Sequence, residues 1–221
     1  MTSYISHLEC SYTGEKYEAN EIHTVSDSGK PLLVRYDLER LAAEVSRDDV
    51  ESSKEPGFWR YSALLPVDDP NNRVSLGEVV TPLVRIEETA RLIGANPDKL
   101  LIKDESRLPT GSFKARGLGL AVSMAKQLGV EHIAIPTNGN AGSALAAYAA
   151  RAGIRATVLC PDNTPEINMR EALAQGAETH IVNGLIGECG RVISDGLKMV
   201  GWFAVSTLKE PYRIEGKKTM G

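Results

Sequence analysis

The sequence lacks the features that mark membrane proteins and disulfide-rich secreted proteins. No hydrophobic run approaches the roughly 18 residues that a membrane-spanning helix requires. The first residues, MTSYISHLECSYTGE, contain no apolar stretch like that of a signal peptide. Cysteine is scarce, because Cys10, Cys160 and Cys189 are an odd number at wide spacing. These absences favour a cytoplasmic protein with no membrane partner, whose cysteines are free thiols with a packing role.

Patterns for metal and nucleic-acid binding are also missing. The four histidines show no paired helical spacing, so no metal cluster built on them is expected. The net charge is −4 and the basic residues are scattered, which argues against a nucleic-acid partner. The 221 residues are 42% hydrophobic and 24% charged. This is the composition of a globular protein long enough for one large domain or two small ones.

The second half of the chain alternates between expected strands and expected helices. The helices are predicted at about 112–128, 140–151, 165–175 and 187–199, and the strands between and after them are EHIAIPT, RATVLCP, THIVN and WFAVST. Alternation at these lengths is typical of right-handed βαβ units. The sequence therefore predicts an α/β protein with a parallel sheet.

The first half is less regular. Its first thirty residues are polar and rich in turn formers, after which PLLVRYD is predicted to be a strand and DLERLAAEVSR an amphipathic helix. GFWRYSALLPV is expected to be a core-facing helix. Short strands are expected in GEVVTPLVRI, broken at Pro82, and in LLIKDE.

One strand-to-helix turn lies where ligands bind in parallel sheets, at the carboxyl end of a strand. In IAIPTNGNAGSALAAYAARAG, Gly139 and Gly142 let the backbone approach a ligand, and free N–H groups at the helix start suit an anion. Asn140 is either a ligand-binding residue or simply a helix N-cap. The turn has neither the GK-Ser/Thr of a Walker loop nor the three glycines of a dinucleotide fingerprint.

Lys114, in PTGSFKARG, stands where a structural lysine gains little. At the first turn of a helix the macrodipole presents partial positive charge, which together with partial burial lowers the pKa of an amine. A neutral amine is the form that attacks a carbonyl carbon. The alternative is a solvated lysine whose stem lies over the helix. Gly117 and Gly119, inside the same helix, predict close packing against a neighbour.

The motif context decides against the solvated alternative. TGSFKARG, preceded by LIKDESRLP and followed by TNGNAGSA, resembles the signature of the tryptophan-synthase-β-like family of pyridoxal-phosphate enzymes, also called fold type II. Within that family the chain resembles the threonine synthases from about His7 onward, through PLLVRYDL, LGEVVTPL and KEPYRIEGKKTMG. The resemblance implies a three-layer parallel sheet with helices on both faces, pyridoxal 5'-phosphate as cofactor, a small amino-acid substrate, and a homodimer as one permitted assembly.

The resemblance also implies an activity and residue roles. The reaction would convert O-phosphohomoserine and water to threonine and phosphate. Lys114 would hold the cofactor covalently and carry protons between substrate carbons, and Asn140 would hydrogen-bond the cofactor's ring hydroxyl. Arg213 would bind the substrate's phosphate through its permanently charged guanidinium, unless it is a surface ion pair. The substrate's α-carboxylate would be cradled by Thr137, Asn138, Gly139 and Ala141.

The sequence departs from the family pattern in several places. Ala141 stands where many relatives carry a hydroxyl residue, and Ala115 where many carry an acidic residue. The resemblance therefore does not decide between closely related substrates. Relatives can carry two C-x-x-C-G zinc knuckles, whereas here the corresponding stretches run from Cys10 to Gly14 and from Val25 to Gly29. One sulfur of four remains, so no metal site is expected.

The family pattern implies four segments: a degenerate zinc-ribbon-like lead (1–35), part of a larger cofactor domain (36–110), a complete smaller βαβ domain (111–208) and a return into the larger domain (209–221). The family's glycine-rich phosphate cup and its pyridine-nitrogen partner lie downstream of EGKKTMG. We therefore expect an N-terminal part that is not active alone. The alternatives are a serine or threonine dehydratase-type β-elimination, and a non-catalytic homologue that acts as an interaction domain.

Overall fold

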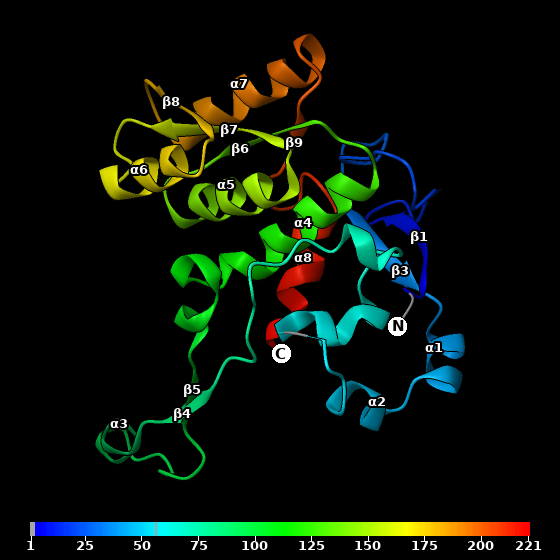
Figure 1. Cartoon of the computed structure of the whole chain (residues 1–221), viewed down its shortest axis with the longest axis vertical. Coiled ribbons are helices and arrows are strands. Elements are labelled where there is room, and N and C mark those ends of the chain that lie inside the picture. Colours follow the sequence, from blue (N-terminus) through cyan, green and yellow to red (C-terminus); the bar gives the residue numbers. More distant parts are fainter. Residues whose placement is uncertain (1–2, 56) are drawn as a thin grey trace.

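A four-stranded parallel sheet organises one end of the molecule (Figure 1). The structure is a computed structural model that describes residues 3–55 and 57–221. The strand order is β8-β7-β6-β9, and all three neighbouring pairs are parallel. The strands are β6 (His132–Pro136), β7 (Arg155–Pro161), β8 (Glu178–Val182) and β9 (Phe203–Ala204). The predicted parallel sheet is confirmed.

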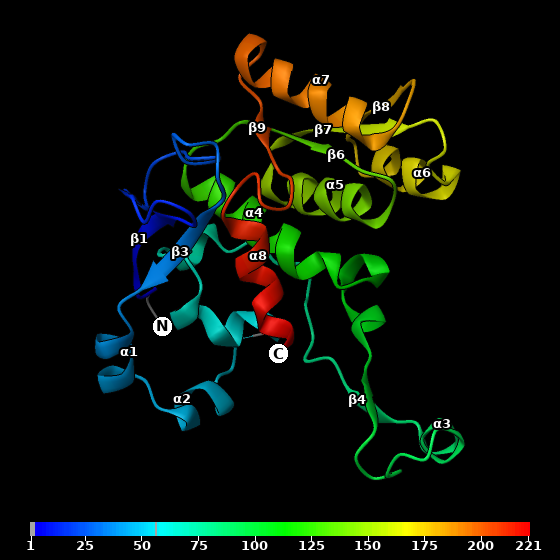
Figure 2. The same ribbon diagram turned by 180° about the vertical axis from the view of Figure 1, so that it is seen from behind.

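Helices cover both faces of this sheet, which confirms the three-layer α/β class. Helices α5 (Asn140–Ala152) and α6 (Glu166–Ala174) lie on one face, and α7 (Ile186–Met199) lies on the other (Figures 1 and 2). Side chains such as Ile133 and Leu145 between these layers are fully buried. Each such side chain contributes about 1.5–3 kcal/mol to folding.

Two helices cross closely beneath the sheet. They are α4 (Lys114–Gln127) and α8 (Tyr212–Lys217). Their crossing places the cationic side chains of Lys114 and Arg213 near each other. A Cβ on Gly117 would lie 2.8 Å from the carbonyl oxygen of Arg213, and one on Gly216 would lie 2.1 Å from that of Arg116. The predicted close packing at Gly117 is therefore confirmed, and the crossing depends on two glycines that face opposite helices.

The N-terminal region contains an antiparallel sheet with the order β2-β1-β3. Its strands are β1 (Ile5–Cys10), β2 (Lys16–Tyr17) and β3 (Leu32–Tyr36). β3 was predicted, but β1 and β2 were missed, because the first thirty residues are mostly polar. β1 buries only Leu8 and Cys10 and is held by its pairing with β3.

The helix expected in DLERLAAEVSR is shorter than predicted: it forms α1 (Leu38–Glu44) and ends where Val45 is extended. Ser46 then begins a helix that was not predicted, α2 (Arg47–Glu51), with a capping box to Asp49. The helix expected in GFWRYSALLPV is a 3₁₀ helix, η1 (Gly57–Leu64), although it buries Phe58 and Trp59 as expected. The other 3₁₀ helices are η2 (Pro70–Asn72), η3 (Glu105–Arg107), η4 (Pro109–Gly111) and η5 (Lys218–Met220).

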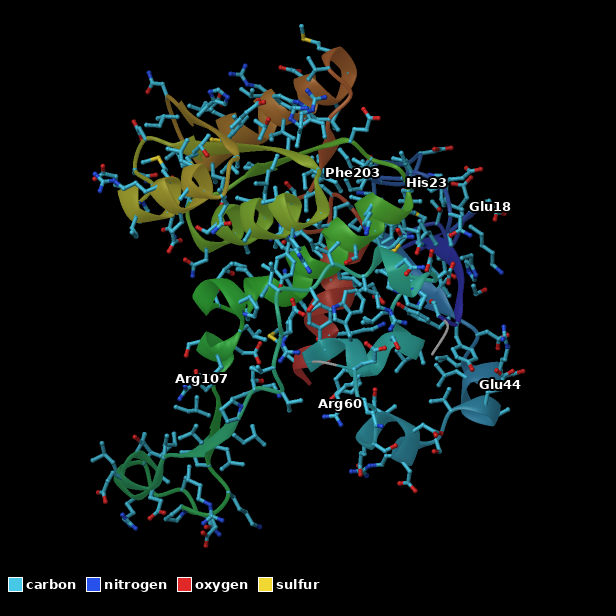
Figure 3. The ribbon with its side chains drawn as sticks, in the orientation of Figure 1. Glu18, His23, Glu44, Arg60, Arg107 and Phe203 are labelled. Carbon is cyan, nitrogen blue, oxygen red and sulfur yellow. The ribbon has the colours of Figure 1, made fainter. Side chains whose placement is uncertain are left out.

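Residues 82–104 form an arm that projects away from the rest of the molecule (Figure 1). It consists of β4 (Leu83–Arg85), α3 (Glu87–Leu92) and β5 (Leu101–Lys103), with β4 and β5 paired antiparallel. Figure 3 shows Arg107 where the arm joins the body. Aliphatic side chains of the arm, such as Leu83 and Leu92, are exposed.

Within the described residues, no helix combines the length and the hydrophobicity needed to cross a membrane. All three cysteines are free and buried, as predicted. Cys10 lies with its Sγ 3.2 Å from the Oγ of Ser26 and 3.5 Å from that of Ser28, and it accepts the N–H of Thr13 at 3.4 Å. These hydrogen bonds lower the pKa of the Cys10 thiol to about 6. Hydrogen bonds thus join the two stretches that resemble zinc knuckles.

Candidate active site

All seven residues proposed from the sequence line one cavity of about 570 Å³. The cavity lies at the carboxyl end of β6, between the start of α5, the start of α4 and α8. This is the edge of a parallel sheet where ligands bind. The seven residues are Lys114, Thr137, Asn138, Gly139, Asn140, Ala141 and Arg213.

Lys114 is brought to the cavity by a tight turn before α4. Thr110 and Gly111 both have left-handed backbone, with φ of 63° and 66°. This conformation is strained for threonine, and such strain is typical of functional sites. The turn makes Lys114 the first residue of α4, with its Nζ 4.3 Å from the ring centroid of Phe113.

The environment of Lys114 favours its neutral form. Burial lowers the pKa of its amine, and the positive charge of Arg213 lowers it further. The predicted direction is therefore confirmed, although the sequence did not anticipate Arg213 as a cause. A lowered pKa makes the neutral form of this half-buried amine more accessible, and that form attacks a carbonyl carbon.

The turn after β6 is shaped by one hydroxyl group. The Oγ1 of Thr137 accepts the N–H groups of Gly139 at 3.1 Å and Gly142 at 3.3 Å, and donates to the carbonyl of Gly139 at 3.0 Å. A Cβ on Gly142 would lie 2.6 Å from the Cγ2 of Thr137, so a larger residue does not fit without displacing this turn. The Thr137 hydroxyl therefore holds the turn, and its contribution to substrate binding stays a prediction.

Asn140 is not the helix N-cap. Gly139 occupies the N-cap position, and Asn140 is the first residue of α5. The Oδ1 of Asn140 accepts a hydrogen bond of 3.1 Å from the Nδ2 of Asn168 on α6. The capping alternative is therefore wrong, and the exposed Asn140 side chain is available to the cavity.

Arg213 is buried rather than part of a surface ion pair, with 5% of the residue exposed. Its Nη1 donates to the carbonyl of Val205 at 3.2 Å, while its Nε has no hydrogen-bond partner among the described residues. The adjacent Glu210 carboxylate accepts the backbone N–H groups of Tyr212 and Arg213. Burial raises the pKa of Glu210 to about 7, so near neutral pH this carboxyl only partly balances the cations.

Lys217 adds a third cation to this region. It lies one helical turn after Arg213, and its Nζ donates to the Oγ1 of Thr207 at 3.3 Å. Burial and the charges of Arg213 and Lys114 lower the pKa of Lys217. Three cations and one partly neutralised carboxyl leave an excess of positive charge, which favours an anionic ligand.

Sequence reasoning missed part of the cavity wall. Ser206 and Thr207 follow β9, and the rule that ligands bind at carboxyl ends of parallel strands could have identified them. Asn168 lies within α6 and carries no comparable sequence signal. The lining residues that were not predicted are Pro136, Asn168, Ile186, Ser206 and Thr207.

The described residues contain no group of three or more His, Cys, Asp or Glu side chains placed to hold a metal ion. The cavity offers an amine of lowered pKa, a buried guanidinium, an amide and the N–H groups of a helix start. This set suits an anionic compound that also carries a carbonyl group.

Comparison with known proteins gives a consistent result. The family model described as "Pyridoxal-phosphate dependent enzyme" matches residues 74–221. The threonine synthase of Methanocaldococcus jannaschii is 34% identical over 212 residues, which cover 96% of this chain and 51% of that protein. The threonine synthase of Methanosarcina acetivorans is 33% identical, with coverage of 97% and 52%. The chain thus spans about half the length of these curated relatives.

Solved structures share the fold. A diaminopropionate ammonia lyase from Escherichia coli, in complex with D-serine, matches with a TM-score of 0.60 at 22% identity, covering 67% of this chain and 45% of that one. A pyridoxal 5'-phosphate-dependent aspartate racemase matches with a TM-score of 0.55 at 24% identity, covering 78% and 48%. These similarities support the three-layer architecture.

Proposed function

The chain belongs to the family of pyridoxal-phosphate dependent enzymes, and on this premise we propose that it serves the threonine synthase reaction. In that reaction O-phosphohomoserine and water give threonine and phosphate. The observation that carries the proposal is the position of a neutral-leaning lysine and a buried arginine on one cavity. The first group suits the cofactor, and the second suits a substrate phosphate.

The cavity residues fit pyridoxal phosphate. Lys114 supplies an amine of lowered pKa for the aldehyde of the cofactor. The Asn140 side chain is exposed at the start of α5 and lines the same cavity. When bound, the cofactor supplies an electron sink for negative charge on substrate carbons.

Lys114 is the proposed proton carrier. Because burial and Arg213 lower its pKa, the amine gives up a proton more readily than a solvated lysine does. It can therefore accept a proton from one substrate carbon and return it to another. Its position on the first turn of α4 keeps the amine beside the cavity during this movement.

Arg213 is the proposed phosphate-binding residue. Its guanidinium group belongs to a buried residue on the cavity wall, so an incoming oxyanion gains a charge-assisted hydrogen bond with little competition from water. The excess of positive charge from Lys114 and Lys217 adds long-range attraction for a doubly charged phosphate. We propose that N–H groups at the start of α5 receive the α-carboxylate.

The test measures two products from the protein expressed from its complete reading frame. Phosphate released from O-phosphohomoserine is compared with 2-oxobutyrate formed from threonine. We expect phosphate release to be the faster reaction. Arg213→Gln should lower kcat/KM for O-phosphohomoserine by about 10- to 100-fold, because a charge-assisted hydrogen bond is lost. Arg151→Gln, at the exposed end of α5, is the matched control and should change little.

A dehydratase would behave differently. Threonine carries no phosphate, so an enzyme of that type should form 2-oxobutyrate efficiently and should tolerate the loss of Arg213's charge. Efficient 2-oxobutyrate formation without phosphate release would refute the proposed reaction. Failure to bind pyridoxal phosphate at all would refute the enzymatic role.

A further inference from the structure

Asn168 contacts the cavity from a helix that contributes no other residue to it. It lies in α6, lines the cavity, and donates its Nδ2 to the Oδ1 of Asn140 at 3.1 Å. A Cβ on Gly139 would lie 3.3 Å from the Oδ1 of Asn168. The glycine before Asn140 thus leaves the space through which Asn168 approaches.

Asn168 is itself held in place by its backbone. Its N–H donates to the carbonyl of Pro165 at 3.0 Å, and its carbonyl accepts from the Oγ of Ser143 at 3.4 Å. Ser143 is buried and lies three residues after Asn140, so both face the same side of α5. Asn168 therefore makes hydrogen bonds to two residues of α5 that lie one turn apart, Asn140 and Ser143.

The contact has a defined hydrogen-bonding polarity. An amide offers one acceptor oxygen and two N–H donors. Because Asn168 occupies the oxygen of Asn140, the Nδ2 hydrogens of Asn140 remain, and they have no acceptor among the described residues. Asn140 is thereby presented to the cavity as a donor.

We infer that Asn168 is a positioning residue, which orients the Asn140 amide so that its N–H donates to the oxygen of the ring hydroxyl of bound pyridoxal phosphate. This inference rests on the proposed function. An exposed asparagine side chain samples several orientations, and its amide can present either the oxygen or the nitrogen to a ligand. Asn168, whose Nδ2 donates to the Oδ1 of Asn140, favours the orientation in which an N–H of Asn140 faces the cavity before the cofactor arrives, which improves binding through preorganisation.

Two substitutions of Asn168 distinguish a positioning role from a general effect on the fold. Asn168→Ala removes the donor and should weaken the affinity for pyridoxal phosphate by about three- to tenfold, which is the loss in affinity that removing one hydrogen bond usually causes. Asn168→Asp keeps the shape but replaces the donor with acceptors. Its carboxylate should attract an N–H of Asn140 and turn the Asn140 oxygen toward the cofactor. It should therefore weaken binding more than alanine does, and shift the absorption band of the bound cofactor.

The measurement is a spectroscopic titration of the cofactor-free protein, expressed from its complete reading frame, with pyridoxal phosphate. Asn163→Ala is the control, because Asn163 is exposed in the loop before α6 and its side chain makes no hydrogen bond within the described part of the chain. It should leave both affinity and spectrum unchanged. Thermal melting of each variant shows whether the fold is retained.

A double-mutant cycle with Asn140→Ala decides the mechanism. If Asn168 acts through Asn140, Asn168→Ala should cause no further loss of affinity once Asn140 is already alanine. Additive losses would overturn the inference, and so would an Asn168→Asp variant that binds as tightly as the wild type. A wild-type protein that binds no pyridoxal phosphate would overturn the proposed function together with this inference. Normal binding with additive losses would overturn the inference alone.

Discussion

The parallel-sheet region and the arm differ in how their hydrophobic side chains are covered. In the sheet region Ile133, Ile135 and Leu145 are 0% exposed, whereas in the arm Leu83 is 61% and Leu92 86% exposed. The candidate site belongs wholly to the covered region and to α8, which packs against it. The buried helices and strands of this region fix the backbone positions of Lys114 and Asn140, and Arg213 is itself buried. The arm, which lacks such cover, contributes nothing to the cavity.

The comparison predicts a large difference between two leucine substitutions. Leu145→Ala should lower the free energy of unfolding by about 2–5 kcal/mol, because it opens a cavity between α5 and the core. Leu92→Ala in the arm should change it by less than about 0.5 kcal/mol. Urea denaturation monitored by circular dichroism measures both. Equal losses would show that the arm is packed in solution, and would remove the contrast.

A second pair of substitutions, both from glycine to alanine, tests the crossing of α4 and α8. Gly216→Ala should destabilise the protein by about 1–3 kcal/mol, because the new Cβ would lie 2.1 Å from the Arg116 carbonyl oxygen. Gly190 lies inside α7, and a Cβ added there would have no neighbouring atom within 4 Å. Gly190→Ala should therefore stabilise the protein by up to about 1 kcal/mol. Thermal melting distinguishes the two. If Gly216→Ala were as stable as the wild type, the two helices would not need this close approach.

Hydrophobic periodicity predicted the sheet region well. Helices α4, α5, α6 and α7 lie within about two residues of their expected ranges, since each combines a buried face with a clear turn at its end. The N-terminal sheet was harder. β1 and β2 depend on pairing with β3, and pairing between distant segments leaves little trace in local sequence.

The candidate site was predicted only where it follows the chain's own motifs. Thr137 to Ala141 are consecutive and follow a strand, so a local rule finds them. Asn168 reaches the cavity through the packing of α6, which no short motif records. The burial of Arg213 was likewise missed, since it depends on the glycines at the crossing of α4 and α8.

A charge substitution in each region tests the electrostatic part of the comparison. Arg213→Gln removes a positive charge that lowers the pKa of Lys114, so that pKa should rise. The amine then becomes neutral only at higher pH, and its reaction with pyridoxal should move to higher pH. Arg85→Gln, in the exposed Arg85–Asp98 pair of the arm, should leave the profile unchanged. Rates measured across pH decide this, and coincident profiles for Arg213→Gln and the wild type would contradict it.

The smallest expected effect concerns the N-terminal sheet. It buries Leu8, Cys10 and Leu32 in the main core, and Cys10 is held by a hydrogen bond to the Ser26 hydroxyl and one from the backbone N–H of Thr13. Treatment with a chelator should therefore leave the melting temperature unchanged. Elemental analysis should find no stoichiometric zinc. One zinc per chain would show that this sheet, unlike the parallel sheet, needs a metal for its stability.

The most direct test of the site is to identify the amine that reacts with the cofactor. The protein is incubated with pyridoxal phosphate, the adduct is reduced with borohydride, and the modified peptide is identified by mass spectrometry. Because Lys114 combines a lowered pKa with a place on the cavity wall, we expect the label on Lys114 alone and its loss in Lys114→Ala. Lys126, at the far end of the same helix, should stay unmodified. Label on Lys217 or on any other lysine in place of Lys114 would contradict the assignment.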